Sequence, residues 1–172
     1  MKFKVLIPKK EILSKIKKVA KELNREYKNK EIVLVMIMKS SIRFVSDLIP
    51  HLKDPLIVEY IGCTSFKKNS LDRKKLVISN LKNLNLKDKH VLLVDDIFDS
   101  GVTLSAVADQ IIKKNPASLK TLVLLYKKSK KETAFLPDKF LFEVEDNFVL
   151  GYGLDYKENY RGLKHIYTAE KK

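Results

Sequence analysis

The sequence predicts an α/β fold, in which a mostly parallel β-sheet is flanked by helices. Three observations support this class. The segment IVLVMIM (32–38) is apolar without interruption, which indicates a strand covered on both faces. Stretches with helical periodicity alternate with such strands, and this order favours parallel strands joined by crossover helices. The chain has 172 residues, enough for one well-packed domain.

A first helix is predicted between Lys10 and Lys28. Apolar residues recur there at steps of three or four positions, which gives the helix one buried face. These residues are Ile12, Ile16, Val19, Leu23 and Tyr27. The strand from Ile32 to Met38 and the turn KSS come next. The segment IRFVSDLIPHL is then predicted as a short helix that ends near Pro50.

Further strands are predicted in the segments PLIVEYIG, KLVIS, HVLLV and LKTLVLLY. A helix from about Val102 to Lys114 lies between the last two and ends before Pro116, because a proline disfavours helical geometry in the residue before it. After Tyr126 the pattern weakens. The segment KKSKKETAFLPDKF is predicted as an exposed connection, and the chain from NFVLGYGLDY onward as short extended pieces and turns.

Composition narrows the functional classes. Lys and Arg total 35 against 21 acidic residues, a net charge of +14, but the lysines are scattered as on a solvated surface. The single cysteine, Cys63, cannot form an internal disulfide, and the histidines are too far apart for a zinc site. The chain shows no secretory signal and no apolar run of the ~18–20 residues that span a bilayer. We expect a cytoplasmic protein without a nucleic-acid or membrane partner.

The stretch VLLVDDIFDSGVTLSAV (91–107) is the strongest functional signal. A strand that ends at Val94 would place Asp95 and Asp96 at its carboxyl end, where parallel sheets bind ligands. The following SGVT would open a helix, whose unpaired N–H groups and positive dipole suit a phosphate. Because carboxylates repel phosphate, the acidic side chains must contact another part of the ligand: vicinal hydroxyls, a metal ion or a proton to be moved.

Alternatives account for only parts of this stretch. Asp99 and Ser100 could simply cap the helix, but this leaves the aspartate pair and the glycine without a role. A receiver domain also has a strand that ends in two aspartates, but too little chain follows here and no later strand ends in an aspartate. The metal-binding DDxxD helix of prenyl-transferring enzymes is excluded by the β-rich VLLV before the acids and the Ser-Gly after them.

The stretch VLLVDDIFDSGVT resembles the phosphoribosyl-pyrophosphate signature of the type I phosphoribosyltransferases. From about Ile32 to Tyr167 the chain is similar to the hypoxanthine-guanine branch of that family. The resemblance implies transfer of a 5-phosphoribosyl group from phosphoribosyl pyrophosphate to hypoxanthine or guanine, with Mg²⁺ as cofactor, in purine salvage. It also implies one domain over residues 1–172, with a small hood from the N-terminal region and about 148–172, in a homodimer or homotetramer.

Within the signature, the resemblance implies a role for each polar residue. Asp99 is the catalytic base that takes a proton from purine N7. Asp95 and Asp96 bind the ribose hydroxyls and, with Asp155, the magnesium ion. The 5′-phosphate is bound by Ser100, Gly101, Val102 and Thr103.

Two further loops are similar to active-site loops of the family. Lys39 and Ser40, in MIMKSSIRFVSDL, correspond to a loop that presents backbone N–H groups to pyrophosphate. The family usually has glycine after this lysine, often with a cis peptide. Ser65 and Phe66, in CTSFKKNSLDRKK, correspond to a mobile loop that closes over the reaction, where the family typically carries Ser-Tyr. A phenylalanine still supplies an apolar lid that excludes water.

The purine-binding residues are also identified by resemblance. Lys127, just after TLVLLY, is implied to donate to the purine 6-oxo group, which favours 6-oxopurines over adenine. In FVLGYGLDYKENYRGL, Phe148 is implied to stack on the base and the backbone of Val149 to meet its edge. Arg161 is implied to bind pyrophosphate, for which its bidentate and permanently charged fork is suited.

Two other functions stay open from the sequence. An RNA-binding regulator with the phosphoribosyltransferase fold would suit the net charge of +14, but it would need a concentrated basic face. A xanthine-guanine or pyrimidine phosphoribosyltransferase would carry a related signature. The segment FVLGYGLDY fits the hypoxanthine-guanine branch better.

Overall fold

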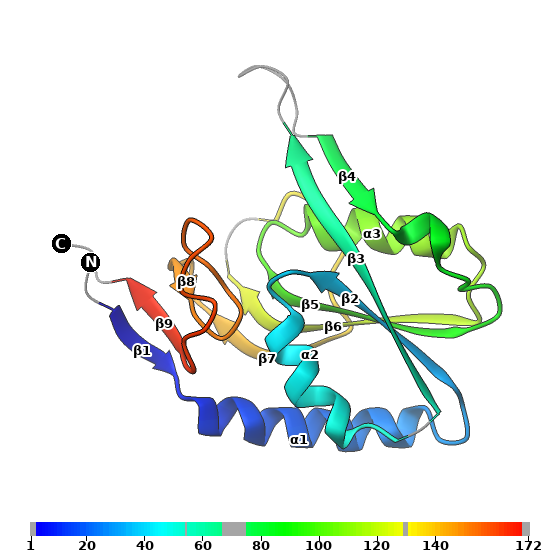
Figure 1. Cartoon of the computed structure of the whole chain (residues 1–172), viewed down its shortest axis with the longest axis horizontal. Coiled ribbons are helices and arrows are strands. Elements are labelled where there is room, and N and C mark those ends of the chain that lie inside the picture. The colour runs from blue at the N-terminus through cyan, green and yellow to red at the C-terminus, as the bar shows by residue number, and fades with distance from the viewer. Residues whose placement is uncertain (1–2, 54, 67–74, 129–130, 170–172) are drawn as a thin grey trace.

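The structure is a computed structural model that describes residues 3–53, 55–66, 75–128 and 131–169. Within these residues, the main element is a six-stranded sheet with the order β4-β3-β2-β5-β6-β7 (Figure 1). All neighbouring strands are parallel except β3 and β4, so the predicted fold class is confirmed. The strands are β2 (Ile32–Met38), β3 (Leu56–Phe66), β4 (Lys75–Ser79), β5 (His90–Phe98), β6 (Ser118–Lys127) and β7 (Lys139–Val144).

Helices cover both faces of this sheet. Helices α1 (Lys9–Glu26) and α2 (Ile42–Leu48) lie on one side and α3 (Val102–Ile112) on the other (Figure 1). The side chains of each central strand alternate between two apolar clusters. In β5, Leu92 and Val94 pack in the cluster that contains α1 and α2, while the neighbouring residues Val91 and Leu93 pack with α3. This burial on both sides explains why the central strands are apolar without interruption.

The helices follow their predicted patterns closely. The five apolar residues predicted for the inner face of the first helix are all buried, although the last of them, Tyr27, is the C-cap that follows α1. Helix α2 ends at Leu48 and passes into the 3₁₀ helix η1 (Ile49–His51), which contains Pro50; a second 3₁₀ helix, η2 (Leu81–Asn83), follows β4. In the part of the chain that the structure describes, no helix combines the length and the hydropathy needed to cross a membrane.

A second, three-stranded antiparallel sheet joins the two ends of the chain. Its order is β1-β9-β8, from β1 (Phe3–Ile7), β9 (Ile166–Ala169) and β8 (Val149–Leu150). Figure 1 shows it on the side of the main sheet where β2 ends, and its strands come from the segments for which the resemblance implies a small hood. The boundary of that hood near residue 148, and its status within one domain over residues 1–172, stay predictions.

The structure corrects three details of the sequence prediction. Strands β1 and β7 were not predicted, and β7 begins inside the segment expected to be an exposed connection. Strand β5 does not end at Val94 but continues to Phe98. Asp95 and Asp96 therefore lie within the strand, where Asp95 pairs with Val123 of β6. Pairing with β6 extends β5 beyond the point at which the charged side chains suggested a stop.

Candidate active site

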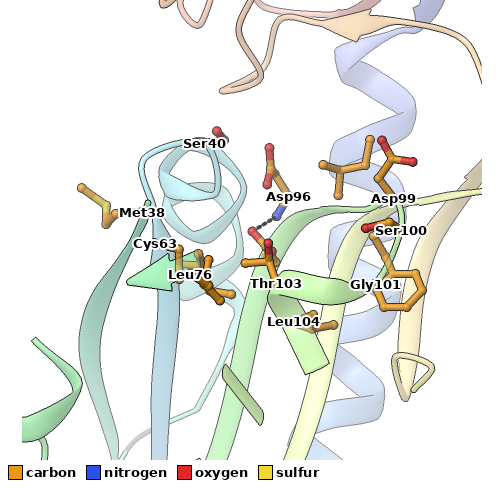
Figure 2. A pocket seen from close by; sticks show the side chains of 14 residues that line it. Met38, Ser40, Cys63, Leu76, Asp96, Asp99, Ser100, Gly101, Thr103 and Leu104 are labelled. Carbon is orange, nitrogen blue, oxygen red and sulfur yellow. Dashed lines mark hydrogen bonds between the residues drawn. The ribbon is translucent and has the colours of Figure 1, made fainter. Parts of the chain in front are cut away.

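A cavity of about 270 Å³ lies where β2 and β5 separate (Figure 2). The pairing of these two strands ends at Met36 and Val94, although both strands continue. The residues that follow in each strand therefore face an opening at the carboxyl ends of parallel strands, the usual ligand position in such sheets. The polar residues that line the cavity are Ser40, Cys63, Asp95, Asp96, Asp99, Ser100 and Thr103, together with Gly101.

Asp95 and Asp96 are a buried carboxylate pair. Each residue is only 7% exposed, and the backbone N–H of Asp96 donates to Asp95 Oδ1 over 2.9 Å (Figure 2). Burial and the adjacent charge of Asp96 raise the pKa of Asp95, and burial also raises the pKa of Asp96. Among the described residues, neither carboxylate forms an ion pair with a lysine or arginine. The pair is therefore suited to accept hydrogen bonds from hydroxyls or to bind a cation.

Replacing Asp95 with asparagine should stabilise the protein. A raised folded-state pKa means that the folded state binds the proton more tightly than the unfolded state, so stability falls as pH rises above the unfolded value of ~3.9. We expect the substitution to raise the free energy of unfolding by about 1 kcal/mol at pH 7, as measured by urea denaturation. The gain should shrink as the pH approaches ~3.9. A less stable variant at pH 7 would contradict this account of the buried charge.

Helix α3 begins beside the carboxylates. Its N-cap is Gly101, at a φ of +89°, so this position is not occupied by Asp99 or Ser100 as the capping alternative required. Gly101 and Thr103 line the cavity, whereas Val102 is 42% exposed and does not. The backbone N–H groups at a helix start are unpaired and carry the positive end of the helix dipole. The cavity thus combines carboxylates with a site for an anion.

Asp99 lies at the rim of the cavity and contacts Lys127. Its side chain is 53% exposed, and Lys127 Nζ lies 3.2 Å from Asp99 Oδ2. The Lys127 side chain is only 12% exposed and also lies 3.4 Å from Asp146 Oδ1. The structure therefore brings the implied base, which follows β5 directly, together with the implied purine donor at the end of β6, and Lys127 lies between two carboxylates.

Arg161 connects the C-terminal segment to the end of β2. Its Nη1 donates to Ser40 Oγ over 2.8 Å and to Gly153 O over 3.0 Å. Its Nη2 lies 2.8 Å from Asp155 Oδ1. A Cβ added to Gly153, whose φ is +104°, would lie 2.1 Å from Ser40 O, so the two segments touch closely. Arg161 and Ser40, both implied to bind pyrophosphate, thus lie side by side.

Glu158 lies between the two cations implied to bind pyrophosphate. Its Oε2 is 3.0 Å from Lys39 Nζ and 3.3 Å from Arg161 Nη2. Hydrogen bonds from Lys39 and then from Arg161 lower the pKa of Glu158, which stays ionised between them. The sequence does not mark Glu158 as a site residue, because it lies in a polar turn without a motif. Its contact with Lys39, 119 positions earlier in the chain, distinguishes Glu158 from an ordinary surface glutamate.

Phe148, implied to stack on the base, and Val149, whose backbone is implied to meet its edge, both lie outside the lining of this cavity. Phe148 is 47% exposed, and its ring meets that of Tyr156 edge-on, with centroids 5.4 Å apart. Val149 is buried in β8, where it pairs with Thr168. The exposed ring of Phe148 leaves it accessible to a planar ligand, but the structure does not place it against the carboxylate pair.

The implied mobile loop is described only at its start. Ser65 and Phe66 form the last two positions of β3, where they pair with the first residues of β4. The remainder of the loop, residues 67–74, lies outside the described residues. A cis peptide joins Met38 to Lys39, one bond before the Lys39–Ser40 bond at which the resemblance suggested one.

The three residues implied to bind magnesium do not form one cluster. In the described ranges, no group of three or more His, Cys, Asp or Glu side chains is placed to hold a metal ion. Asp155 is engaged by Arg161 through Oδ1 and by the backbone N–H of Glu158 through Oδ2. Asp95 and Asp96 remain adjacent to one another inside the cavity.

Three further residues lie near the site although the sequence did not predict them there: Cys63, Asp146 and Lys131. Cys63 lines the cavity, and burial, with a smaller effect of Asp95, raises the pKa of its thiol to about 11. Asp146 and Lys131 contact Lys127 from segments that looked like surface. In a chain with 35 lysines and arginines, no local signal separates such residues from the solvated surface.

The chain is similar to known proteins in its domain family, its sequence and its fold. A family model described as "Phosphoribosyl transferase domain" matches residues 7–157. The chain is 35% identical over 170 residues to a hypoxanthine-guanine phosphoribosyltransferase of Aquifex aeolicus, covering 98% of this chain and 96% of the relative. It is 33% identical over 163 residues to a hypoxanthine-guanine phosphoribosyltransferase of Bacillus subtilis, covering 95% of this chain and 91% of the relative.

Solved structures give the same result. The crystal structure of a hypoxanthine phosphoribosyltransferase from Staphylococcus aureus is similar at a TM-score of 0.91 and 29% identity, covering 97% of this chain and 91% of that chain. A hypoxanthine-guanine phosphoribosyltransferase from Bacillus anthracis is similar at a TM-score of 0.86 and 31% identity, covering 99% of this chain and 100% of that chain. The similarity therefore extends over the whole fold and includes every element that borders the cavity.

Proposed function

The chain belongs to the phosphoribosyltransferase family, and we propose that it is a purine salvage enzyme. It transfers a 5-phosphoribosyl group from phosphoribosyl pyrophosphate to hypoxanthine or guanine and gives IMP or GMP and pyrophosphate. One observation carries the proposal: a single cavity contains the Asp95–Asp96 pair and the start of α3, with the Asp99–Lys127 pair at its rim. Relatives that are 33–35% identical over nearly the whole chain are named for this activity.

The cavity suits the sugar phosphate in two ways. The carboxylates of Asp95 and Asp96 accept hydrogen bonds from the 2′ and 3′ hydroxyls of the ribose. The backbone N–H groups at the start of α3 and the hydroxyl of Thr103 donate to the 5′-phosphate. Lys39 and Arg161 both contact the carboxylate of Glu158 in the structure. In the complex with substrate, these two cations bind the pyrophosphate at the other end of the molecule.

In the reaction, an imidazole nitrogen of the purine forms a bond to carbon 1 of the ribose. The bond from carbon 1 to the pyrophosphate oxygen breaks, and pyrophosphate leaves with the electron pair. Asp99 accepts the proton that the purine loses at N7, and Lys127 donates to the 6-oxo group. Both residues of this ion pair therefore contact the base. The ribose becomes cation-like in the transition state, which the negative carboxylate pair beside it stabilises.

The donor set is consistent with magnesium, which we propose as the cofactor. Carboxylate oxygens are the ligands that this ion prefers, and the buried Asp95–Asp96 pair forms no ion pair with a described lysine or arginine. Asp155, with both oxygens engaged by Arg161 and the N–H of Glu158, would act through water. When bound, magnesium supplies charge neutralisation for the departing pyrophosphate.

We also propose that the enzyme acts in the cytoplasm as a homodimer or homotetramer. Strand β3 exposes Val58 and Tyr60 on one face, and these apolar side chains are consistent with assembly. Sedimentation of the purified protein measures the oligomeric state directly. The RNA-binding alternative is not favoured, because the relatives in sequence and structure carry the names of enzymes.

The proposed function is tested by direct assay. The protein is incubated with Mg²⁺, phosphoribosyl pyrophosphate and one base at a time: hypoxanthine, guanine, xanthine or adenine. We expect the monophosphates of hypoxanthine or guanine to form, and little product from adenine, because Lys127 places a donor where adenine carries an amino group. Absence of product with every base would overturn the proposal. Product only with xanthine or adenine would show that the proposed base is wrong and would identify the actual one.

Replacing Glu158 with glutamine should improve binding of the pyrophosphate end of the substrate. In the structure its carboxylate pairs with Lys39 and Arg161, so it must be displaced before these cations bind another anion. Exposed ion pairs of this kind are weak because water screens them, so we expect the KM for phosphoribosyl pyrophosphate to fall only roughly 2- to 5-fold. Steady-state kinetics at varied phosphoribosyl pyrophosphate measure the effect. An increase in this KM would show instead that Glu158 holds the cations in a productive arrangement.

A further inference from the structure

The connection between β6 and β7 lies against the loop that precedes α3. The backbone N–H of Glu132 donates to Ser100 O over 2.9 Å. Lys131 Nζ donates to Asp99 O, also over 2.9 Å. The sequence predicts an exposed connection here, and nothing in the composition of this segment indicates a partner. The contact joins two segments that are about thirty positions apart in the chain.

Lys131 also contacts the end of β6. Its ammonium group donates to Lys127 O and lies 4.4 Å from the centre of the Tyr126 ring and 5.2 Å from that of Phe98. Phe98 and Tyr126 pair at the ends of β5 and β6, and their rings stack with centroids 5.6 Å apart. One cation therefore contacts the ends of both strands, the one that leads to Asp99 and the one that leads to Lys127.

These contacts orient two peptide groups of the cavity loop. In a trans peptide, C=O and N–H point in opposite directions. Because Asp99 O and Ser100 O face residues 131 and 132, the N–H groups of Ser100 and Gly101 point away from that segment. Both residues line the cavity. The connection thus influences which way the anion-binding N–H groups are directed.

We propose that Lys131 is a positioning residue of the phosphoribosyl transfer. By donating to Asp99 O and Lys127 O, it holds the residue that accepts the purine proton and the residue that donates to the 6-oxo group in one arrangement. The inference rests on the proposed function, in which Asp99 and Lys127 act on the same base. Lys131 is not a catalytic residue, because it acts through the backbone of the two residues that contact the substrate.

The energetics of Lys131 agree with this role. Burial is the main cause that lowers the pKa of its ammonium group, so the site holds a partly desolvated cation. Two carbonyl oxygens and two aromatic faces compensate for the lost water. Proton transfer requires the base within about 2.6–3.2 Å of its target, and a misplacement of ~1 Å can reduce the rate about 10²-fold. A displaced Asp99 loop would therefore affect turnover more than folding.

The test compares Lys131→Met with Lys131→Arg in the full-length protein. Methionine keeps the length of the side chain but removes all donors, whereas arginine keeps a cation that can donate to both carbonyls. We expect Lys131→Met to lower kcat roughly 10- to 100-fold with hypoxanthine, and Lys131→Arg to regain most of it. Circular dichroism and thermal melting verify that both variants are folded.

Lys128→Met is the matched control. Lys128 lies three positions away, is half exposed and pairs only with Glu143 and Glu145 among the described residues. We expect its kcat to stay within about twofold of the wild type, the usual result for a surface charge. The inference is overturned if Lys131→Met stays within twofold of Lys128→Met, or if Lys131→Arg is no better than Lys131→Met. A wild-type protein that is inactive with every base would overturn the proposed function itself.

Discussion

Replacing Asp99 with asparagine should reduce kcat by about 10²–10⁴-fold while the protein remains folded. Asparagine has the shape of aspartate and can still accept a hydrogen bond from Lys127 Nζ, which lies 3.2 Å from Asp99 Oδ2. It cannot accept the proton that the purine loses. Because the Asp99 side chain is 53% exposed, the substitution leaves no buried group without a partner. Turnover with saturating hypoxanthine and phosphoribosyl pyrophosphate measures the effect, and the KM values should change little.

Asp146→Asn provides the matched control for this experiment. Asp146 also pairs with Lys127, at 3.4 Å, and its side chain is 67% exposed. The same chemical change on the other side of the same lysine should lower kcat by less than about threefold, as for a surface ion pair. If Asp99→Asn kept full turnover, Asp99 would not be the base. If both variants lost activity equally, the charge around Lys127 would be the cause and not proton transfer.

Replacing Gly101 with alanine should lower the free energy of unfolding by about 2–4 kcal/mol and weaken binding of phosphoribosyl pyrophosphate. Two effects add at this position. The φ of +89° is strained for any residue with a Cβ. The new Cβ would also lie 2.5 Å from the Thr133 methyl carbon and 2.7 Å from Phe98 Cζ, so the start of α3 must shift. Urea denaturation and equilibrium binding of the substrate measure the two consequences.

Gly162→Ala is the control for the glycine substitution. Gly162 has no atom within 4 Å of an added Cβ and no positive φ, so its replacement should change stability by less than about 0.5 kcal/mol. Thr133→Ser removes the methyl group that the new Cβ of Gly101→Ala would meet. The double variant should therefore recover part of the lost stability, while the strain from φ and from Phe98 persists. A Gly101→Ala variant as stable as Gly162→Ala would contradict this description of the loop.

Much of the fold was predictable because its signals are local. The unbroken apolar run of β2, and its burial between two layers of helices, follow from one sequence pattern. The inner face of α1 follows from the spacing of its apolar residues. Strands β1 and β7 were missed because edge strands are partly exposed and carry mixed residues. In β7, KFLFEV includes Phe140, which is 44% exposed, and only its pairing with β6 makes it a strand.

The local sequence is enough to specify the chemical groups of the site. Two carboxylates, a third close behind and a glycine before a helix are set by adjacent positions in VLLVDDIFDSGVT, so their proximity needs no long-range contact. The partners of these groups depend on tertiary contacts. Lys127 reaches Asp99 across 28 positions, Lys131 reaches the same loop across 32, and Arg161 reaches Ser40 across 121. Pairing across a sheet and packing of the C-terminal segment depend on the whole chain, and among so many lysines and arginines the local sequence does not distinguish those that take part.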